Sequence, residues 1–160
     1  MKRASTLFLK AVILLLGIGV LTMCVFLFPE LLSAGIRDVP EFRHVYYPAI
    51  IGVFLTTIPF FFALYQAFKL LHYIDKNNAF SELSIQALRY IKYCGIAMSV
   101  FYAVGMPFVV VLAELDDAPG AIVIGMAIVV APLIVATFAA VLQKLVQNAV
   151  DMKLENDLTV

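Results

Sequence analysis

Charged residues are scarce in this chain. Only 14% of its 160 residues are Asp, Glu, Lys or Arg, whereas a soluble domain carries about 25%. Hydrophobic residues make up 64%, more than a monomer of this size can bury. The composition therefore excludes a water-soluble monomer. It also excludes an intrinsically disordered chain, which needs few apolar residues and many charges. An integral membrane protein remains.

An excess of positive charge and a set of paired cysteines are also missing. Eleven Lys and Arg balance eleven Asp and Glu, so no basic surface for direct nucleic-acid binding is expected. The two cysteines, Cys24 and Cys94, lack the spacing of a metal or redox motif. They are placed near opposite membrane faces, too far apart for a disulfide. We expect both to be small buried apolar side chains.

Long uninterrupted apolar runs are what the sequence has in abundance. A helix needs about 20 apolar residues to cross a bilayer core of about 30 Å. Barrel strands would be shorter and would alternate in polarity. We therefore predict an all-α fold, with residues 1–160 as a single integral membrane domain and a four-helix transmembrane bundle. The four expected spans cover about residues 7–28, 46–71, 91–113 and 121–146.

The distribution of Lys and Arg predicts how the spans are oriented. The N-terminus, the middle connection and the tail hold nine of these residues, whereas the other two loops hold only Arg37 and Arg43. Positive residues concentrate on the cytoplasmic side of membrane proteins. Both termini and the middle connection are therefore expected in the cytoplasm.

Chemistry-bearing groups are almost absent from the expected spans. Lys10, Lys69 and Lys144 lie near cytoplasmic ends, where their ammonium groups can reach water. Most hydroxyl side chains inside the spans can bond to their own helix. We find no nucleophile–base pair, His-Glu metal motif or Gly-rich phosphate loop. These absences disfavour a proton relay or an ion-coupled carrier, and neither an enzyme nor a cofactor is expected.

The two outer loops carry most of the remaining polar residues. The first, residues 29–45, has mixed charges and the breakers Gly35 and Pro40, and we expect a solvated lid with local ion pairs. The second contains Glu114, Asp116 and Asp117. These carboxylates are weak candidates for a hard cation such as Ca²⁺. The favoured interpretation is that Asp116 or Asp117 caps the fourth helix, with Pro119 in its first turn.

The cytoplasmic connection between the second and third spans has the strongest local signals. Residues 75–78 are typical of a turn, and Ser81 is a natural N-cap, with Phe80 and Ile85 in the positions of a hydrophobic staple. Leu83, Ala87, Leu88 and Ile91 then recur at helical spacing. We therefore expect a short amphipathic lead-in to the third span. It could contact a cytoplasmic partner, hold anionic lipid headgroups or serve only as an interfacial helix. The candidate partner-binding residues are Asp75, Lys76, Phe80, Glu82, Arg89 and Lys92.

Prolines and small residues mark how the spans could bend and pack. Pro59, Pro107 and Pro132 should each kink a helix, and packing is favoured over gating as their role. Small residues recur every fourth position, which allows close helix approach and leaves a homo-oligomer open. We expect the third and fourth spans to form a tight antiparallel hairpin. The small residues are Gly95, Ser99 and Ala103 in the third span and Ala127, Ala131, Ala136 and Ala140 in the fourth.

Residues 74–81 (IDKNNAFS) and 87–94 (ALRYIKYC) resemble a family of small four-span bacterial membrane proteins. The resemblance extends to residues 113–120 (AELDDAPG) and to the closing 155–160 (ENDLTV). That family is catalogued only as a conserved domain of unknown function, and its members are often encoded beside a small helix-turn-helix regulator. The resemblance implies a bacterial plasma membrane and a role in a regulatory pair. It supplies no catalytic residue.

Two functions from different classes remain. The favoured one is a non-enzymatic membrane component that binds or regulates a cytoplasmic or membrane protein partner through residues 75–92. The alternative is a small permease or channel subunit that acts as an oligomer, with the proline positions as hinges. Flux through proteoliposomes would separate the two.

Overall fold

The computed structural model describes residues 2–38 and 40–159. Met1 and Val160, the ends of the expected 1–160 domain, lie outside them. The described part consists of helices joined by short turns, which confirms the all-α prediction. The elements in chain order are α1 (Lys2–Thr22), the π-helical turn η1 (Met23–Leu27), α2 (Phe28–Asp38), the 3-10 turn η2 (Pro40–Phe42), α3 (Arg43–Asp75), α4 (Glu82–Leu115) and α5 (Gly120–Leu158).

Four helical segments are long and apolar enough to cross a membrane: the continuous stretch Arg3–Asp38, and α3, α4 and α5. Each of the four expected apolar runs lies within one of them. The last three contain 33, 34 and 39 residues, which at 1.5 Å per residue gives about 50–58 Å. A bilayer core is about 30 Å thick. The helices therefore tilt or extend beyond the hydrocarbon at their ends.

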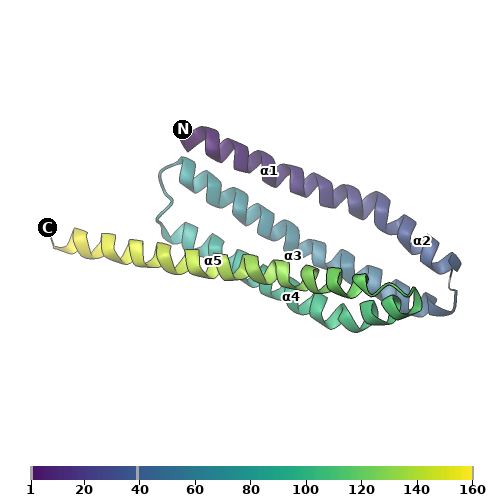
Figure 1. Cartoon of the computed structure of the whole chain (residues 1–160). Coiled ribbons are helices and arrows are strands. Elements are labelled where there is room, and N and C mark those ends of the chain that lie inside the picture. Colours follow the sequence, from purple (N-terminus) through teal and green to yellow (C-terminus); the bar gives the residue numbers. More distant parts are fainter. Residues whose placement is uncertain (1, 39, 160) are drawn as a thin grey trace.

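The long helices pack mainly on their neighbours in the chain. The most extensive contact joins α4 to α5, followed by α3 to α4 and then α1 to α3. Figure 1 shows α1 along one side of α3 and the α4–α5 pair along the other. Within the described residues α1 and α5 make no extensive contact, so the bundle is open between its first and last helices. Both termini and the α3–α4 turn lie at one end of the molecule (Figure 1).

The first outer segment is not the solvated lid that the sequence suggested. Residues 28–38 form α2, which continues from α1 through η1. Gly35 does not break this helix. It lies against Tyr46, whose ring would be 2.9 Å from a Cβ at that position. The expected local ion pairs are also wrong for the described part of this segment. The only salt bridge among the described residues joins Lys10 to Asp75, at the opposite end of the molecule.

The α4–α5 pair is the tight antiparallel hairpin that the small residues predicted. A Cβ on Gly95 would lie 2.7 Å from the carbonyl oxygen of Pro132 and 2.9 Å from the Cβ of Ala136. One turn further along α4, Ser99 donates a hydrogen bond to the carbonyl oxygen of Val129 at 2.7 Å. Not every small residue belongs to this contact, however. Three of them face outward: Ala103, Ala127 and Ala131.

Hydroxyl groups inside the helices divide into two kinds. As expected, several bond only to a carbonyl of their own helix, among them Thr22, Thr57 and Thr137. Thr56 differs, because its buried hydroxyl also lies 3.0 Å from the Tyr102 hydroxyl and so joins α3 to α4. The helices run through Pro59, Pro107 and Pro132, and α3 also contains Pro48.

The second outer turn differs from the expected capping arrangement. Pro119, not an aspartate, occupies the N-cap position of α5, and it provides no side-chain hydrogen bond there. Asp117 instead closes α4 in the left-handed conformation, with φ of 49°. The amide of Ala118 then donates to the carbonyl of Ala113 at 2.9 Å. This is the bond of a Schellman motif, which satisfies the last carbonyls of a helix.

Candidate functional site

The turn between α3 and α4 holds most of the residues that the sequence indicated. Asn77 adopts the left-handed conformation, with φ of 59°, and the amide of Asn78 donates to the carbonyl of Tyr73 at 2.8 Å. This bond ends α3 in a second Schellman motif. Four residues later Ser81 caps α4, because its hydroxyl accepts a hydrogen bond from the amide of Ser84 at 3.4 Å. The predicted turn and N-cap are both present.

The first turns of α4 are amphipathic, but the buried face differs from the expected one. Ser84, Ile85, Ala87 and Leu88 are buried, as α4 packs between its neighbours. Leu83, which was expected on this face, is 49% exposed. Residues 84, 85, 87 and 88 occupy one side of the helix. Position 83 lies at the edge of that side, in the first turn of α4 and one turn before Ala87, so its side chain stays partly uncovered.

Two apolar side chains are therefore exposed beside the turn. Phe80 is 61% exposed, whereas its expected staple partner Ile85 is only 1% exposed, so the two side chains lie in different environments. Leu83 lines a shallow hollow of about 200 Å³ on α4, and Phe80 precedes this stretch in the chain. The residues that line this hollow are Glu82, Leu83, Ile85, Gln86 and Arg89. We call these residues together with Phe80 the α4 entry surface.

The structure distributes the six candidate partner-binding residues over four environments. Glu82 and Arg89 line the hollow, and Phe80 is exposed just before it in the chain. Lys76 is exposed at the turn. Lys92 lies over the ring of Tyr93, with its ammonium 4.8 Å from the ring centroid. Asp75 is directed toward α1 and is already bonded, so it belongs to a helix–helix contact.

That contact joins the ends of α1 and α3. Lys10 forms an ion pair with Asp75 at 2.7 Å, and the Thr6 hydroxyl donates to the other carboxylate oxygen. Asp75 lies one turn beyond the apolar run that ends at Leu71. The hydrogen bond from Lys10, and then the one from Thr6, hold the pKa of Asp75 below its usual value. Thr6 was not among the residues that the sequence pattern indicated. The available signal was its i, i+4 spacing to a Lys that enters an apolar run.

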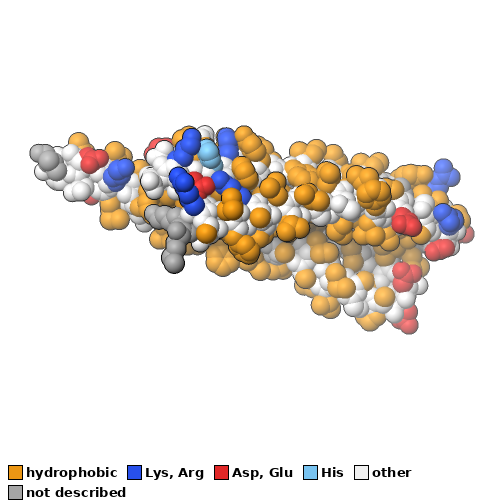
Figure 2. Space-filling view, turned by 90° about the horizontal axis from the view of Figure 1, so that it is seen from above, with side chains coloured by type: hydrophobic (Ala, Val, Ile, Leu, Met, Phe, Trp, Pro, Cys, Tyr) orange, Lys and Arg blue, Asp and Glu red, His pale blue; other side chains and the backbone are white. Residues whose placement is uncertain are grey.

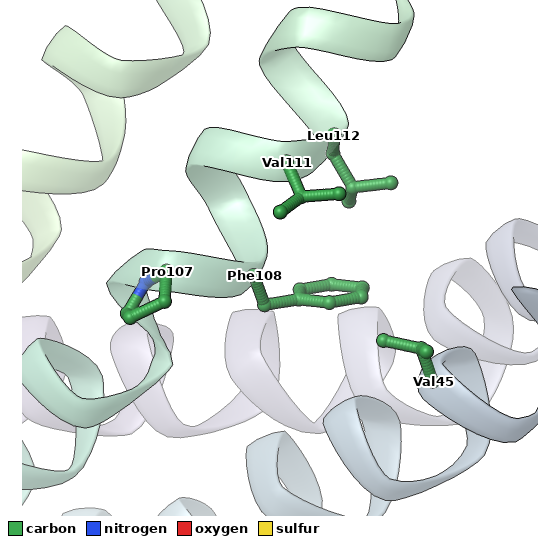
Figure 3. A pocket seen from close by; sticks show the side chains of 5 residues that line it. All are labelled: Val45, Pro107, Phe108, Val111 and Leu112. Carbon is green, nitrogen blue, oxygen red and sulfur yellow. The ribbon is translucent and has the colours of Figure 1, made fainter.

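A second hollow, of about 350 Å³, lies at the opposite end of the molecule between α3 and α4. Figure 3 shows Phe108 of α4 and Val45 of α3 reaching toward each other across it. Its lining is wholly apolar and consists of Val45, Pro107, Phe108, Val111 and Leu112. With no polar side chain it can accommodate hydrocarbon, but it cannot orient a polar substrate.

The acidic residues of the second outer turn do not assemble into a cation site. Among the described residues no group of three or more His, Cys, Asp or Glu side chains is placed to hold a metal ion. Glu114, Asp116 and Asp117 are all exposed. Asp117 has a conformational role at the end of α4.

Comparisons with known proteins agree with this arrangement. The chain is 54% identical over 160 residues to the uncharacterized membrane protein YoaS of Bacillus subtilis, and the match covers 100% of both chains. No solved structure matches. Residues 36–160 match the model of a family described as protein of unknown function DUF2975. The chain is therefore a multi-pass membrane protein that belongs to the DUF2975 family.

Proposed function

We propose that this protein is a non-enzymatic, partner-binding or regulatory component of a bacterial plasma membrane. Both termini and the α3–α4 turn lie in the cytoplasm in this proposal, because nearly all Lys and Arg residues gather at that end. The partner is a protein that docks on the α4 entry surface.

The observation that carries this proposal is apolar exposure outside the apolar spans. Phe80 and Leu83 lie before the third apolar run, which begins near residue 91, and both are exposed. Lipid tails do not cover side chains there, so the two face water or the headgroups. Glu82 and Arg89 flank them with opposite charges. An apolar centre with a polar rim is typical of protein–protein interfaces.

The lining of the two hollows supports a non-enzymatic role. The hollow between α3 and α4 is wholly apolar. The hollow on α4 offers the carboxylate of Glu82 and the guanidinium of Arg89, without a hydroxyl or thiol nucleophile. Neither set provides a nucleophile within reach of a general base, which acyl- or phosphoryl-transfer chemistry needs.

Site-specific photocrosslinking in cells tests the docking proposal. A photoreactive amino acid at Glu82 or Arg89 should yield a protein adduct of defined mass. The same probe at Lys153, on the tail of α5, should not yield that adduct. Adding Phe80→Ala and Leu83→Ala should abolish it, since both side chains are already exposed and their truncation leaves the core intact. Recovery of lipid adducts alone would refute the proposal.

An oligomeric permease or channel is the second candidate. The open side of the bundle between α1 and α5 is the feature that suits it, because a lumen would have to form between copies. Purified protein in proteoliposomes should then pass a tracer ion or solute faster than protein-free vesicles. Equal rates would leave the docking proposal as the better account.

A further inference from the structure

One face of α3 changes from apolar to basic along its length. Ile58, Phe62 and Tyr65 occupy this face and are exposed. Their spacing of four and three residues keeps them in line on a helix. Lys69, His72 and Lys76 continue the same face, at the next positions of that spacing. The face therefore presents hydrocarbon at depth and positive charge at the end of the apolar run.

The end of α1 adds two further bases to this corner. Lys10 reaches α3 through its ion pair with Asp75 and lies 5.4 Å from the centroid of the Phe68 ring. Arg3 lies two turns earlier on α1 and is exposed. Figure 2 shows Lys and Arg side chains gathered around a His at this end of the molecule. We call Arg3, Lys10, Lys69, His72 and Lys76 the basic corner.

The basic corner has more positive charge than its acidic partner neutralises. It holds four Lys and Arg side chains against the single carboxylate of Asp75. Within the part of the chain that the structure describes, Lys10 forms the only salt bridge. Arg3, Lys69 and Lys76 therefore have no carboxylate partner among the described residues. Such an excess attracts an anion at a membrane surface, where each base contributes about 1 kcal/mol.

The bases span a depth slightly greater than that of a headgroup layer, which flexible Lys side chains can accommodate. Seven residues separate Lys69 from Lys76, which is about 10 Å along a helix. The polar region of each bilayer leaflet is about 5–8 Å thick. Lys69 also lies 5.1 Å from the centroid of the Tyr65 ring, so its ammonium marks the boundary between the aromatic ring and the headgroup layer.

We propose that the basic corner binds the phosphate of an anionic phospholipid, whose acyl chain lies along Ile58, Phe62 and Tyr65. The continuous apolar face below the bases favours a lipid over free phosphate, which would need no hydrocarbon surface. The inference does not depend on the proposed protein partner, because Glu82 and Arg89 lie outside the basic corner.

The test measures lipid retention by the full-length chain in neutral detergent. Intact-complex mass spectrometry and melting temperature are recorded with phosphatidylglycerol and with phosphatidylcholine. The parent should retain phosphatidylglycerol preferentially and should melt at a higher temperature with it. The double variant Lys69→Gln/Lys76→Gln should bind phosphatidylglycerol about 30-fold more weakly, the equivalent of about 2 kcal/mol at about 1 kcal/mol per Lys.

A matched control removes the same charge elsewhere. Lys144→Gln/Lys153→Gln, on α5, should keep the preference of the parent, and Lys69→Arg/Lys76→Arg should keep most of it. Lys76→Gln alone, at an exposed position beyond α3, gives the same test if the double variant fails to fold. Equal loss in the α5 control, or an unchanged preference in the corner variants, would overturn the proposal. The proposal would also be overturned if millimolar inorganic phosphate raised the melting temperature as much as phosphatidylglycerol does, because the site would then take free phosphate.

Discussion

At the scale of single residues, two polar side chains end helices in a conformation that usually needs glycine. Asn77 and Asp117 both have positive φ, at 59° and 49°. Each follows a long apolar helix and turns the chain so that the last carbonyls find donors. Asn and Asp tolerate this conformation better than other residues with a Cβ, but it still costs free energy.

Replacing Asp117 with glycine should therefore stabilise the protein. We expect Asp117→Gly to raise the free energy of unfolding by up to about 1 kcal/mol, because glycine adopts positive φ without steric cost. The neighbouring Asp116 has φ of −91°, so Asp116→Gly should give no gain. Melting temperatures in detergent would check both variants. Equal stabilisation by the two would show that loss of charge, not relief of backbone strain, is responsible.

The ion pair of Asp75 attaches α1 to α3 at the end of the molecule that holds both termini. Its pKa is lowered in the folded chain by Lys10 and Thr6, so the ionised carboxylate stabilises the fold. That contribution is fully present above the ordinary Asp value of about pH 4 and is lost as the pH falls through the lower folded-state value.

Asp75→Asn should accordingly lower the melting temperature at pH 7 and weaken the contact between α1 and α3. The difference in melting temperature between parent and variant should shrink as the pH falls below about 4, because Asp75 of the parent then loses its charge as well. Glu114→Gln, at an exposed carboxylate of the outer turn, provides the control and should show no such pH-dependent gap. A gap that stayed constant down to pH 3 would contradict this account.

At the scale of elements, the crossing of α4 and α5 depends on the absence of a side chain at Gly95. The groups that a Cβ would meet there are the Pro132 carbonyl and the Ala136 Cβ. Neither is the flexible end of a side chain, so relief requires the two helices to separate. Tight approach through small residues is the usual way that membrane helices gain packing contacts.

Gly95→Ala should therefore destabilise the protein by about 1–3 kcal/mol, the usual cost of overpacking. Gly105 lies on the same helix with nothing within 4 Å of an added Cβ. Gly105→Ala should be neutral or stabilising, since glycine is a poorer helix former than alanine. Unfolding in mixed detergent micelles would compare the two. A stability gain in both variants would show that the α4–α5 contact is looser than described.

Several elements could be predicted from sequence because they depend on local patterns. The apolar runs predicted the long helices, and Ser81 predicted the start of α4. The helix α2 was missed because Gly35 and Pro40 suggested a loop. Pro29 near its start, Glu30 in its first turn and Arg37 in its last turn were the signals in its favour.

The bonds between helices could not be predicted in the same way. A Ser or Thr hydroxyl on a helix always has a nearby carbonyl of its own helix to accept its proton. The sequence therefore gave no reason to expect that Ser99 reaches Val129 or that Thr56 reaches Tyr102. The candidate site could be predicted only in part for a similar reason. The sequence indicated Glu82 and Arg89, but the exposure of Leu83 depends on how α4 packs.

At the scale of the whole molecule, the chain is a row of helices in which each packs on the next. This order follows from the short turns between α3, α4 and α5, which make consecutive helices antiparallel neighbours. Among the long helices of the described residues, the first packs mainly on α3, through the Asp75 contact and the packing of Gly17 on Leu64. The exposed sides of α1 and α5 are apolar, which suits lipid contact.

The most direct test of the account is the membrane topology. Single cysteines are placed at Asn78, Asp116 and Asn156 in a chain whose Cys24 and Cys94 are replaced by serine or alanine, and intact cells are treated with a membrane-impermeant maleimide. The account predicts labelling at Asp116 alone, with Asn78 and Asn156 reacting only after the cells are opened. Labelling of Asn78 or Asn156 in intact cells would contradict the proposed four-span arrangement with cytoplasmic termini.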